Sequence, residues 1–274
     1  MENKKYIKLQ FSETAEGQHD QLIALLADIG FTGFEEEESI LNAFIEEENF
    51  KSVDLEDVLK KIPANYSKTI VNEENWNAQW ESSFEPILVN YFVGIRAFFH
   101  PPIPQVKYEI VITPKMSFGT GHHATTYMMI EQMEALDLTN KTVVDFGTGT
   151  AVLAILAEKM GATSVDAIDY DEWSIENSIE NAGANNCSKI NLIKDETINT
   201  GSIYDIILAN INLNVILSNL GAIKSVSKKG GFILLSGFMK ADEAIMLENL
   251  AKTGIYPLKT TQKGEWISIL AEMK

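Results

Sequence analysis

From residue 123 onward, the chain alternates segments of helical periodicity with short apolar runs typical of buried strands. This alternation indicates right-handed crossovers and a mostly parallel, doubly wound sheet, that is, a Rossmann-like α/β fold. Ligands bind such sheets beyond the carboxyl ends of the strands, where the strand order reverses. The pattern therefore predicts the location of a binding site before any motif is considered. The seven expected strands are 142–146, 165–169, 190–193, 204–209, 232–235, 255–260 and 266–271, and the expected helices are 123–136, 151–160, 173–183, 213–224 and 242–251.

The first 70 residues carry a different pattern, which predicts a separate module. Its elements follow one another in the order β-α-β-β-α-β, which is that of the small ferredoxin-like α+β fold. We therefore divide the chain into a ferredoxin-like domain at 1–70, a linker helix at 71–83 and an α/β domain at 84–274. The elements expected before residue 123 are strands at 7–11, 31–38, 40–47, 66–71, 87–90, 91–98 and 109–113 and helices at 22–29, 53–62 and 73–82.

Charge also separates the two modules. Acidic residues outnumber basic ones by 39 to 22, a net charge of −17, and residues 1–70 hold 15 acids and 7 bases, almost half of the excess. Such a chain repels phosphate backbones, so we expect no direct binding to nucleic acid. The charge favours a basic partner, although acidity that only keeps the chain soluble is the alternative explanation.

Several other kinds of site are disfavoured. Cys187 is the only cysteine, which excludes an internal disulfide and a multi-cysteine zinc site. His122 and His123 are adjacent and point apart, so we expect no metal site and assign them a structural or loop-closing role. No apolar run of 18 residues and no apolar signal core are present, so we expect a cytoplasmic chain that does not enter a membrane. We also expect a monomer.

A glycine-rich turn follows the expected strand at 142–146. Gly147 and Gly149 permit positive φ and a close approach of the backbone to a ligand, and the next helix turns its free N–H groups toward that ligand. Asp169 ends the following strand 24 residues after Asp145, about where a carboxylate binds both hydroxyls of a ribose. The combination predicts a nucleoside site; the alternative is a tight turn beside an unrelated surface acid.

The same turn favours S-adenosyl-L-methionine over NAD. A dinucleotide would bring a pyrophosphate, which Asp145 would repel, and its loop would have glycine in place of Val152. S-adenosylmethionine has no phosphate, and its ammonium group favours a nearby carboxylate. The spacing resembles the first motif of class I methyltransferases, except that Ala151 stands where a third glycine is usual. We expect its methyl group to be tolerated if the helix start packs slightly further off.

Two more segments supply candidate residues. Asn210 ends the expected strand at 204–209, where class I enzymes that methylate nitrogen often have Asn or Asp to hold the attacking amine. The following Ile211-Asn212-Leu213 differs from the Pro-Pro-aromatic run of base-methylating enzymes, which disfavours an adenine or glutamine target. An asparagine that only caps the next helix is the alternative for Asn210. Upstream, a second glycine loop containing Phe118 and Gly119 is expected beside the cofactor, and Thr126 offers a hydroxyl at the start of a helix.

Together, these motifs resemble the PrmA family, the bacterial methyltransferases of large-subunit ribosomal protein L-eleven. The resemblance rests on Phe-Gly-Thr-Gly-His-His-Ala-Thr-Thr126, Val-Val-Asp-Phe-Gly-Thr-Gly149, Ala-Ile-Asp169 and Leu-Ala-Asn210. It covers residues 73–274, with departures at Ala124, Thr148 and Thr150, where the family commonly has Pro, Cys and Ser.

The resemblance implies a class I methyltransferase domain preceded by a small substrate-recognition domain. It implies methyl transfer from S-adenosylmethionine to lysine side chains and the N-terminal α-amine of L-eleven, with Asn210 as the catalytic residue. The cofactor residues that it implies are Thr126, Gly147, Asp169 and Asn210, to which the residue chemistry adds Asp145, Gly149, Phe118 and Gly119.

Two alternatives stay open at this point. The same catalytic domain could methylate another basic protein or a small amine. The chain could also be a docking protein that binds S-adenosylmethionine without turnover, although Asp145, Asp169 and Asn210 argue against this.

Overall fold

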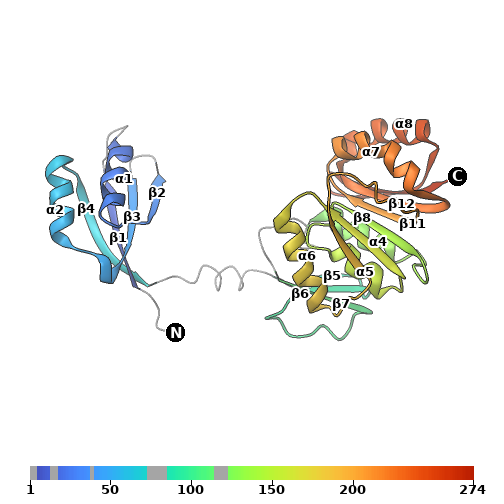
Figure 1. Cartoon of the computed structure of the whole chain (residues 1–274), viewed down its shortest axis with the longest axis horizontal. Coiled ribbons are helices and arrows are strands. Elements are labelled where there is room, and N and C mark those ends of the chain that lie inside the picture. The colour runs from blue at the N-terminus through green and yellow to red at the C-terminus, as the bar shows by residue number, and fades with distance from the viewer. Residues whose placement is uncertain (1–4, 13–17, 38–39, 73–84, 114–122) are drawn as a thin grey trace. The chain divides into compact units, whose positions relative to one another are not determined.

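The computed structural model describes residues 5–12, 18–37, 40–72, 85–113 and 123–274 (Figure 1). The chain divides into two compact units, Met1–Ser83 and Phe84–Lys274, and each is described by itself. The expected linker helix at 73–82 lies outside the described residues, as do Phe118 and Gly119. No helix in the described part of the chain is long and apolar enough to cross a membrane.

The described part of the N-terminal unit contains a four-stranded antiparallel sheet and two helices, α1 and α2. Its elements follow in the predicted order, and alternate residues of the first strand, Ile7, Leu9 and Phe11, enter the core. Gly30, with φ +97°, follows the first helix, as expected for a left-handed stop. The sheet order is β2-β3-β1-β4; assignment of this unit to the ferredoxin-like fold stays a prediction. The elements are β1 (Lys5–Ser12), α1 (Gln18–Asp28), β2 (Gly33–Glu37), β3 (Ile40–Glu46), a 3-10 turn (Glu47–Asn49), α2 (Ser52–Lys61) and β4 (Asn65–Asn72).

The C-terminal unit contains a seven-stranded sheet of order β10-β9-β8-β11-β12-β14-β13. The strands from β10 to β12 are parallel, and β14 is antiparallel to both of its neighbours. This confirms the predicted mostly parallel sheet. The strands are β8 (Thr142–Phe146), β9 (Ser164–Asp169), β10 (Ile190–Lys194), β11 (Tyr204–Asn210), β12 (Ser227–Met239), β13 (Ile255–Lys263) and β14 (Trp266–Met273).

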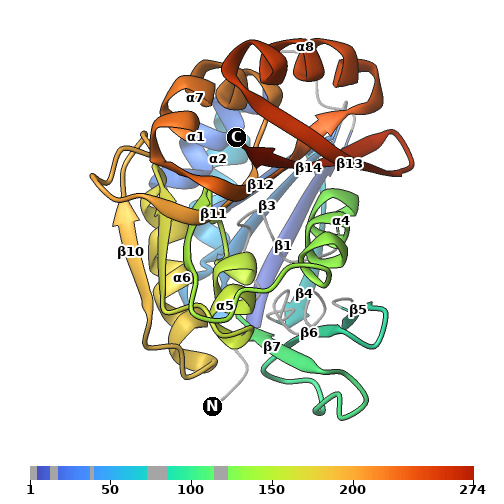
Figure 2. The same ribbon diagram turned by 90° about the vertical axis from the view of Figure 1, so that its right-hand side faces the viewer.

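Successive residues of each central strand enter two different cores. Val143 of β8 contributes to a cluster with α4 and α5, and Val144 contributes to one with α7 and α8, so the two helix layers cover opposite faces of the sheet (Figure 2). This two-sided burial explains why the strands read as continuous apolar runs. The helices are α4 (Ala124–Met133), α5 (Val152–Lys159), α6 (Glu172–Ala184), α7 (Leu213–Val226) and α8 (Glu243–Thr253), with a 3-10 turn at Lys240–Asp242.

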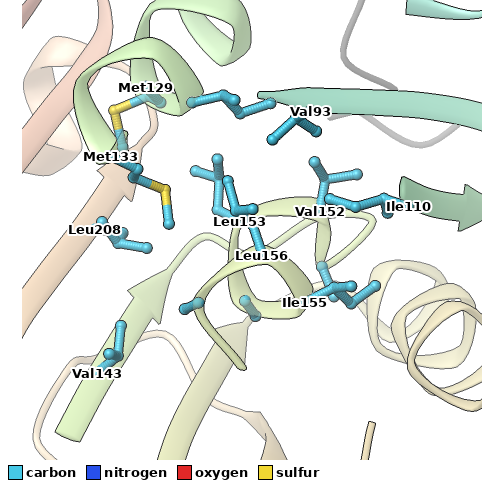
Figure 3. Packing of buried hydrophobic residues seen from close by; sticks show 14 of the residues in the cluster. Val93, Ile110, Met129, Met133, Val143, Val152, Leu153, Ile155, Leu156 and Leu208 are labelled. Atoms are coloured by element: carbon cyan, nitrogen blue, oxygen red, sulfur yellow. The ribbon is translucent and has the colours of Figure 1, made fainter. Parts of the chain in front are cut away.

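A small second sheet of order β5-β6-β7 joins the first of these cores. Figure 3 shows Val93 and Ile110 of this sheet beside Val152 of α5. The three strands are β5 (Ile87–Val89), β6 (Val93–Ala97) and β7 (Tyr108–Ile112), close to the predicted positions.

One strand differs clearly from its prediction. β12 begins at Ser227, five residues before the predicted start at Phe232. Its pairing with β11 shifts register between Ser227 and Phe232, so that regular pairing resumes at the predicted start. The glycines at 230 and 231 hid the first part of the strand, because glycine usually marks a turn.

The residue before α5 adopts a left-handed conformation. Ala151 has φ +62° and ψ +18°, and it is fully buried. Glycine adopts this conformation freely, whereas a residue with Cβ pays about 1–2 kcal/mol. The usual glycine at this position therefore reflects backbone conformation, and not the helix packing distance that we expected from the sequence.

Replacing Ala151 by glycine is expected to raise the free energy of unfolding by up to about 1 kcal/mol, because relief at φ exceeds the loss of a buried methyl worth about 0.8 kcal/mol. Ala151→Val is expected to lower the free energy of unfolding by more than about 2 kcal/mol. A β-branched residue at positive φ is strained, and the buried position leaves no room for the larger side chain. Urea denaturation of both variants measures the difference. A glycine variant less stable than the parent would show that the methyl contact dominates.

Candidate functional site

A cavity of about 760 Å³ opens at the carboxyl ends of β8, β9 and β11. β8 pairs with β9 on one side and with β11 on the other, so the cavity lies at the reversal in strand order, as predicted. Five predicted site residues line it: Thr126, Gly147, Gly149, Asp169 and Asn210.

The glycine loop forms one wall. Gly147 and Gly149 have φ of +79° and +56°, which confirms the predicted positive φ. The amides of Gly147 and Thr148 both donate to the carbonyl of Ile168, at 2.8 and 2.9 Å, so the loop is held on the end of β9. A Cβ at Gly147 would lie 2.1 Å from Cγ2 of Ile211. A side chain at position 147 would therefore clash with Ile211, and Gly147 still lines the cavity with its backbone.

Asp169 lies at the floor of this loop, 8% exposed. Its Oδ2 accepts a hydrogen bond from the amide of Gly149 at 2.9 Å, and its Oδ1 accepts one from the amide of Asp171 at 3.1 Å. An ionised carboxylate has about four acceptor positions, so each oxygen retains capacity for another donor. The arrangement suits a pair of hydroxyl donors such as those of a ribose.

Asp145 does not line the cavity. Its carboxyl is buried, and Oδ2 accepts a hydrogen bond of 2.7 Å from the hydroxyl of Thr148. Burial raises the pKa of Asp145 to about 7 against the effect of this hydrogen bond, and the charge of Asp169 adds to the rise. We had expected this carboxyl to face the cofactor. The structure instead gives it a role within the loop, where it fixes the Thr148 side chain.

Asn210 ends β11 at the cavity wall and is 9% exposed. Its Nδ2 donates to Oγ1 of Thr126, on α4, at 3.2 Å. Its Oδ1 is buried and accepts no hydrogen bond from the described residues. The cap of α7 is Asn212, whose Oδ1 accepts from the amide of Val215 at 3.1 Å. The capping role that was the alternative for Asn210 therefore belongs to Asn212.

The electrostatics of the cavity are one-sided. Four of the described residues that line it are acidic, namely Asp169, Asp171, Asp195 and Glu196, and none of them is lysine or arginine. Such a lining disfavours a phosphate-bearing ligand and favours a cationic one. It fits a nucleoside that carries a positive charge.

Comparisons with known proteins show which family the chain belongs to. A model of the family described as ribosomal protein L11 methyltransferase (PrmA) matches residues 8–274. The chain belongs to this family. The ribosomal protein L11 methyltransferase of Porphyromonas gingivalis is 39% identical over 264 residues, which cover 93% of this chain and 91% of that protein. That of Phocaeicola vulgatus is 34% identical over 280 residues, covering 98% of this chain and all of that protein.

A solved structure extends the likeness to three dimensions. The crystal structure of a ribosomal protein L11 methylase from Lactobacillus delbrueckii subsp. bulgaricus matches with a TM-score of 0.65 and 27% identity, over 70% of this chain and all of that chain. Membership of the PrmA family confirms the predicted class of enzyme, a methyltransferase that uses S-adenosylmethionine, and the Rossmann-like class I fold of the C-terminal unit.

Sequence reasoning missed several residues that line this cavity. Ile211 donates its amide to the carbonyl of Ser236 at 3.1 Å, and a Cβ at Gly237 would lie 2.2 Å from the Ile211 carbonyl oxygen. This contact holds the end of β11 against a register shift in β12. Gly237 has a positive φ of +98°. The glycine within the apolar Leu-Ser-Gly-Phe238 run was the available signal for an irregularity in this strand.

His123 has a structural place in the site. Its Nδ1 accepts from the amide of Thr125 at the start of α4, and its ring meets Trp266 edge-on at 4.5 Å. The other lining residues not predicted are Phe146, Thr148, Val152, Leu153, Tyr170, Asp171, Ser174, Asp195, Glu196, Ile211, Asn212, Val215, Ser218, Asn219, Gly237 and Trp266.

Proposed function

We propose that this enzyme transfers methyl groups from S-adenosylmethionine to amines of ribosomal protein L11, at lysine side chains and the N-terminal α-amine. The observation that carries the proposal is the buried Oδ1 of Asn210 at the cavity wall, which has no hydrogen-bond donor among the described residues. A buried amide oxygen without a donor costs free energy, about 1–3 kcal/mol, unless a ligand supplies one. An uncharged amine has N–H groups that can do so.

The residues of the cavity fit the methyl donor. When bound, S-adenosylmethionine supplies a methyl group made electrophilic by a positively charged sulfur. Asp169 would hold the ribose through its two remaining acceptor positions, and Gly147 and Gly149 would let the backbone pass close to the nucleoside. The acidic lining favours the positive charge, and Thr126 keeps the amide of Asn210 in place.

The amine must reach the site without its proton. A lysine begins with a pKa of about 10.4 and an α-amine near 8, so at neutral pH most of the substrate is charged. Oδ1 of Asn210 accepts from an amine N–H and leaves the nitrogen lone pair free to point at the methyl carbon. Orientation of this kind is worth several kcal/mol, about 7 or more in the best cases. The amine loses its proton to solvent before it binds in the neutral form, so the transfer itself needs no dedicated base.

We assign recognition of L11 to residues 1–70 and transfer to residues 84–274. The acidic excess of the N-terminal unit supports this, because a ribosomal protein is basic and complementary charge steers association. Each unit has its own apolar core, which supports separate folding. We also propose that the enzyme acts as a monomer in the cytoplasm, without direct binding to nucleic acid.

The full chain is expected to add methyl groups to free L11 in the presence of S-adenosylmethionine, as read by mass spectrometry of the intact protein. A form comprising residues 84–274 is expected to bind S-adenosylmethionine normally and to methylate L11 about tenfold or more slowly, because steering and presentation are lost. Added salt should lower the rate of L11 methylation by the full chain more than the rate of methylation by the shortened form, because salt screens the attraction between the acidic unit and L11. Equal methylation rates for both forms would contradict the assignment of L11 recognition to residues 1–70. Methylation of a small amine but not of L11 would contradict the proposal that L11 is the substrate.

A further inference from the structure

α6 buries a polar face. The buried side chains along its length include Ser174, Ser178 and Asn181, and Asn185 at its C-cap is also buried. Two large apolar side chains point outward instead, Trp173 at 76% and Ile179 at 57% exposure. This reverses the usual pattern of a surface helix, whose apolar stripe faces the core. Burial of so many polar groups is costly unless they are hydrogen-bonded, so their partners indicate what the face is for.

Two of these side chains donate hydrogen bonds to backbone carbonyls of the glycine loop. Oγ of Ser178 donates to the carbonyl of Gly149 at 2.7 Å, and Nδ2 of Asn181 donates to the carbonyl of Thr150 at 2.9 Å. The amide of Gly149 is held from the other side by Asp169. The peptide groups that form the cavity wall are thus fixed from both the sheet and α6.

Asn181 also binds a second segment. Its Oδ1 accepts from the amide of Thr113 at 2.7 Å, just after β7. One planar amide therefore joins the backbone after β7 to the backbone of the glycine loop. Alanine can make neither bond, and aspartate lacks the donor that the Thr150 carbonyl needs.

Asn185 provides a natural comparison, one turn further on. Its Nδ2 and Oδ1 bind the carbonyl and amide of Val111, at 2.6 and 3.0 Å, within β7. It has the same chemistry and nearly the same burial as Asn181, but its hydrogen bonds within the described part of the chain go to Val111 and to the carbonyl of Asn181, and not to the glycine loop. Any effect that depends on the loop should appear at Asn181 and not at Asn185.

We propose that Asn181 is a positioning residue for S-adenosylmethionine: through the carbonyl of Thr150 it fixes the glycine loop in the conformation that receives the nucleoside. The inference rests on the proposed use of this cavity as the cofactor site. Asn181 does not line the cavity, so it acts through the loop and not by contact.

The test compares Asn181→Ala with Asn185→Ala in the full chain. Asn181→Ala is expected to raise both the Kd for S-adenosylmethionine, measured by calorimetry, and its KM about tenfold, because a loosened loop must be ordered on binding. The kcat at saturating cofactor should change less than about threefold. Asn185→Ala is expected to lower the thermal stability about as much as Asn181→Ala does. It should leave the Kd and KM for S-adenosylmethionine within about twofold of the parent values.

Three outcomes would overturn the inference, and a fourth would refute the proposed function. Equal cofactor affinity in the parent chain and the Asn181 variant overturns the inference, and so does an equal loss in both variants, which would indicate a general effect on stability. If Asn181→Ala fails to fold, Asn181→Leu, which loses both hydrogen bonds but keeps the volume of the buried side chain, should still weaken binding about threefold or more; unchanged affinity in that variant overturns the inference too. Failure of the parent chain to bind S-adenosylmethionine would instead refute the proposed function.

Discussion

Replacing Asn210 by alanine is expected to lower kcat about 100-fold or more and to change the affinity for S-adenosylmethionine less than about threefold. The reason is that Oδ1 has its task in the transition state, where it orients the amine, and interactions realised only there raise kcat. Loss of one preorganised polar contact at a reacting centre typically costs about 10²–10³ in rate. Steady-state methylation at saturating L11 and cofactor measures kcat, and calorimetry measures cofactor affinity.

The matched control is Asn212→Ala, the same change two residues further along. Asn212 also lines the cavity, but its Oδ1 already accepts from the amide of Val215 as the cap of α7, so its loss should cost about 1 kcal/mol of stability and lower kcat far less than the loss of Asn210. Asn210→Asp keeps an acceptor oxygen and should retain more activity than Asn210→Ala. If Asn210→Ala turned over at the parent rate, the unpartnered oxygen would have no part in the chemistry.

Local patterns predicted most of the C-terminal unit. The strand at 142–146 was predicted at the bounds that β8 has, and Asp169 was predicted to end its strand, as it does. Apolar runs, glycine turns and helix periodicity are properties of a few neighbouring residues, so they survive without knowledge of the tertiary structure. The position of the cavity followed from the order of elements alone.

Tertiary partners could not be predicted in this way. Asn210 and Asn212 stand two residues apart in one strand-to-helix turn, and only the positions of Thr126 and Val215 show which of them caps the helix. Alanine rarely adopts a positive φ, so the residue at 151 did not itself indicate one; the glycine that is usual at this position was the available signal.

The polar face of α6 also could not be predicted from local patterns. Helical periodicity locates the helix, but it assigns apolar residues to the buried side, whereas here Trp173 points outward and Asn181 inward. The burial of Asn181 depends on backbone carbonyls and amides from two distant segments, and the chain sequence carries no local signal for either.

Replacing Asp169 by asparagine is expected to raise the Kd for S-adenosylmethionine about 100-fold, close to 3 kcal/mol. The shape is kept, but one oxygen becomes an N–H₂ group that meets the amide of Gly149 or Asp171 donor to donor, and the acceptors for the ribose hydroxyls lose their charge. Calorimetric titration of the variant with S-adenosylmethionine measures the loss, and turnover at very high cofactor concentration should recover in part.

Asp166→Asn is the matched control, because it removes one carboxylate from the same strand. Asp166 accepts from the hydroxyl of Tyr204 at 2.5 Å and from Asn191 at 3.1 Å, and it does not line the cavity. Its variant should lose stability and keep the Kd within about threefold. The two carboxylates differ in position by three residues and not in formal charge, so a loss of affinity confined to Asp169→Asn would come from the missing acceptor and not from a general change in the electrostatic field. A Kd unchanged in Asp169→Asn would remove this residue from the cofactor site.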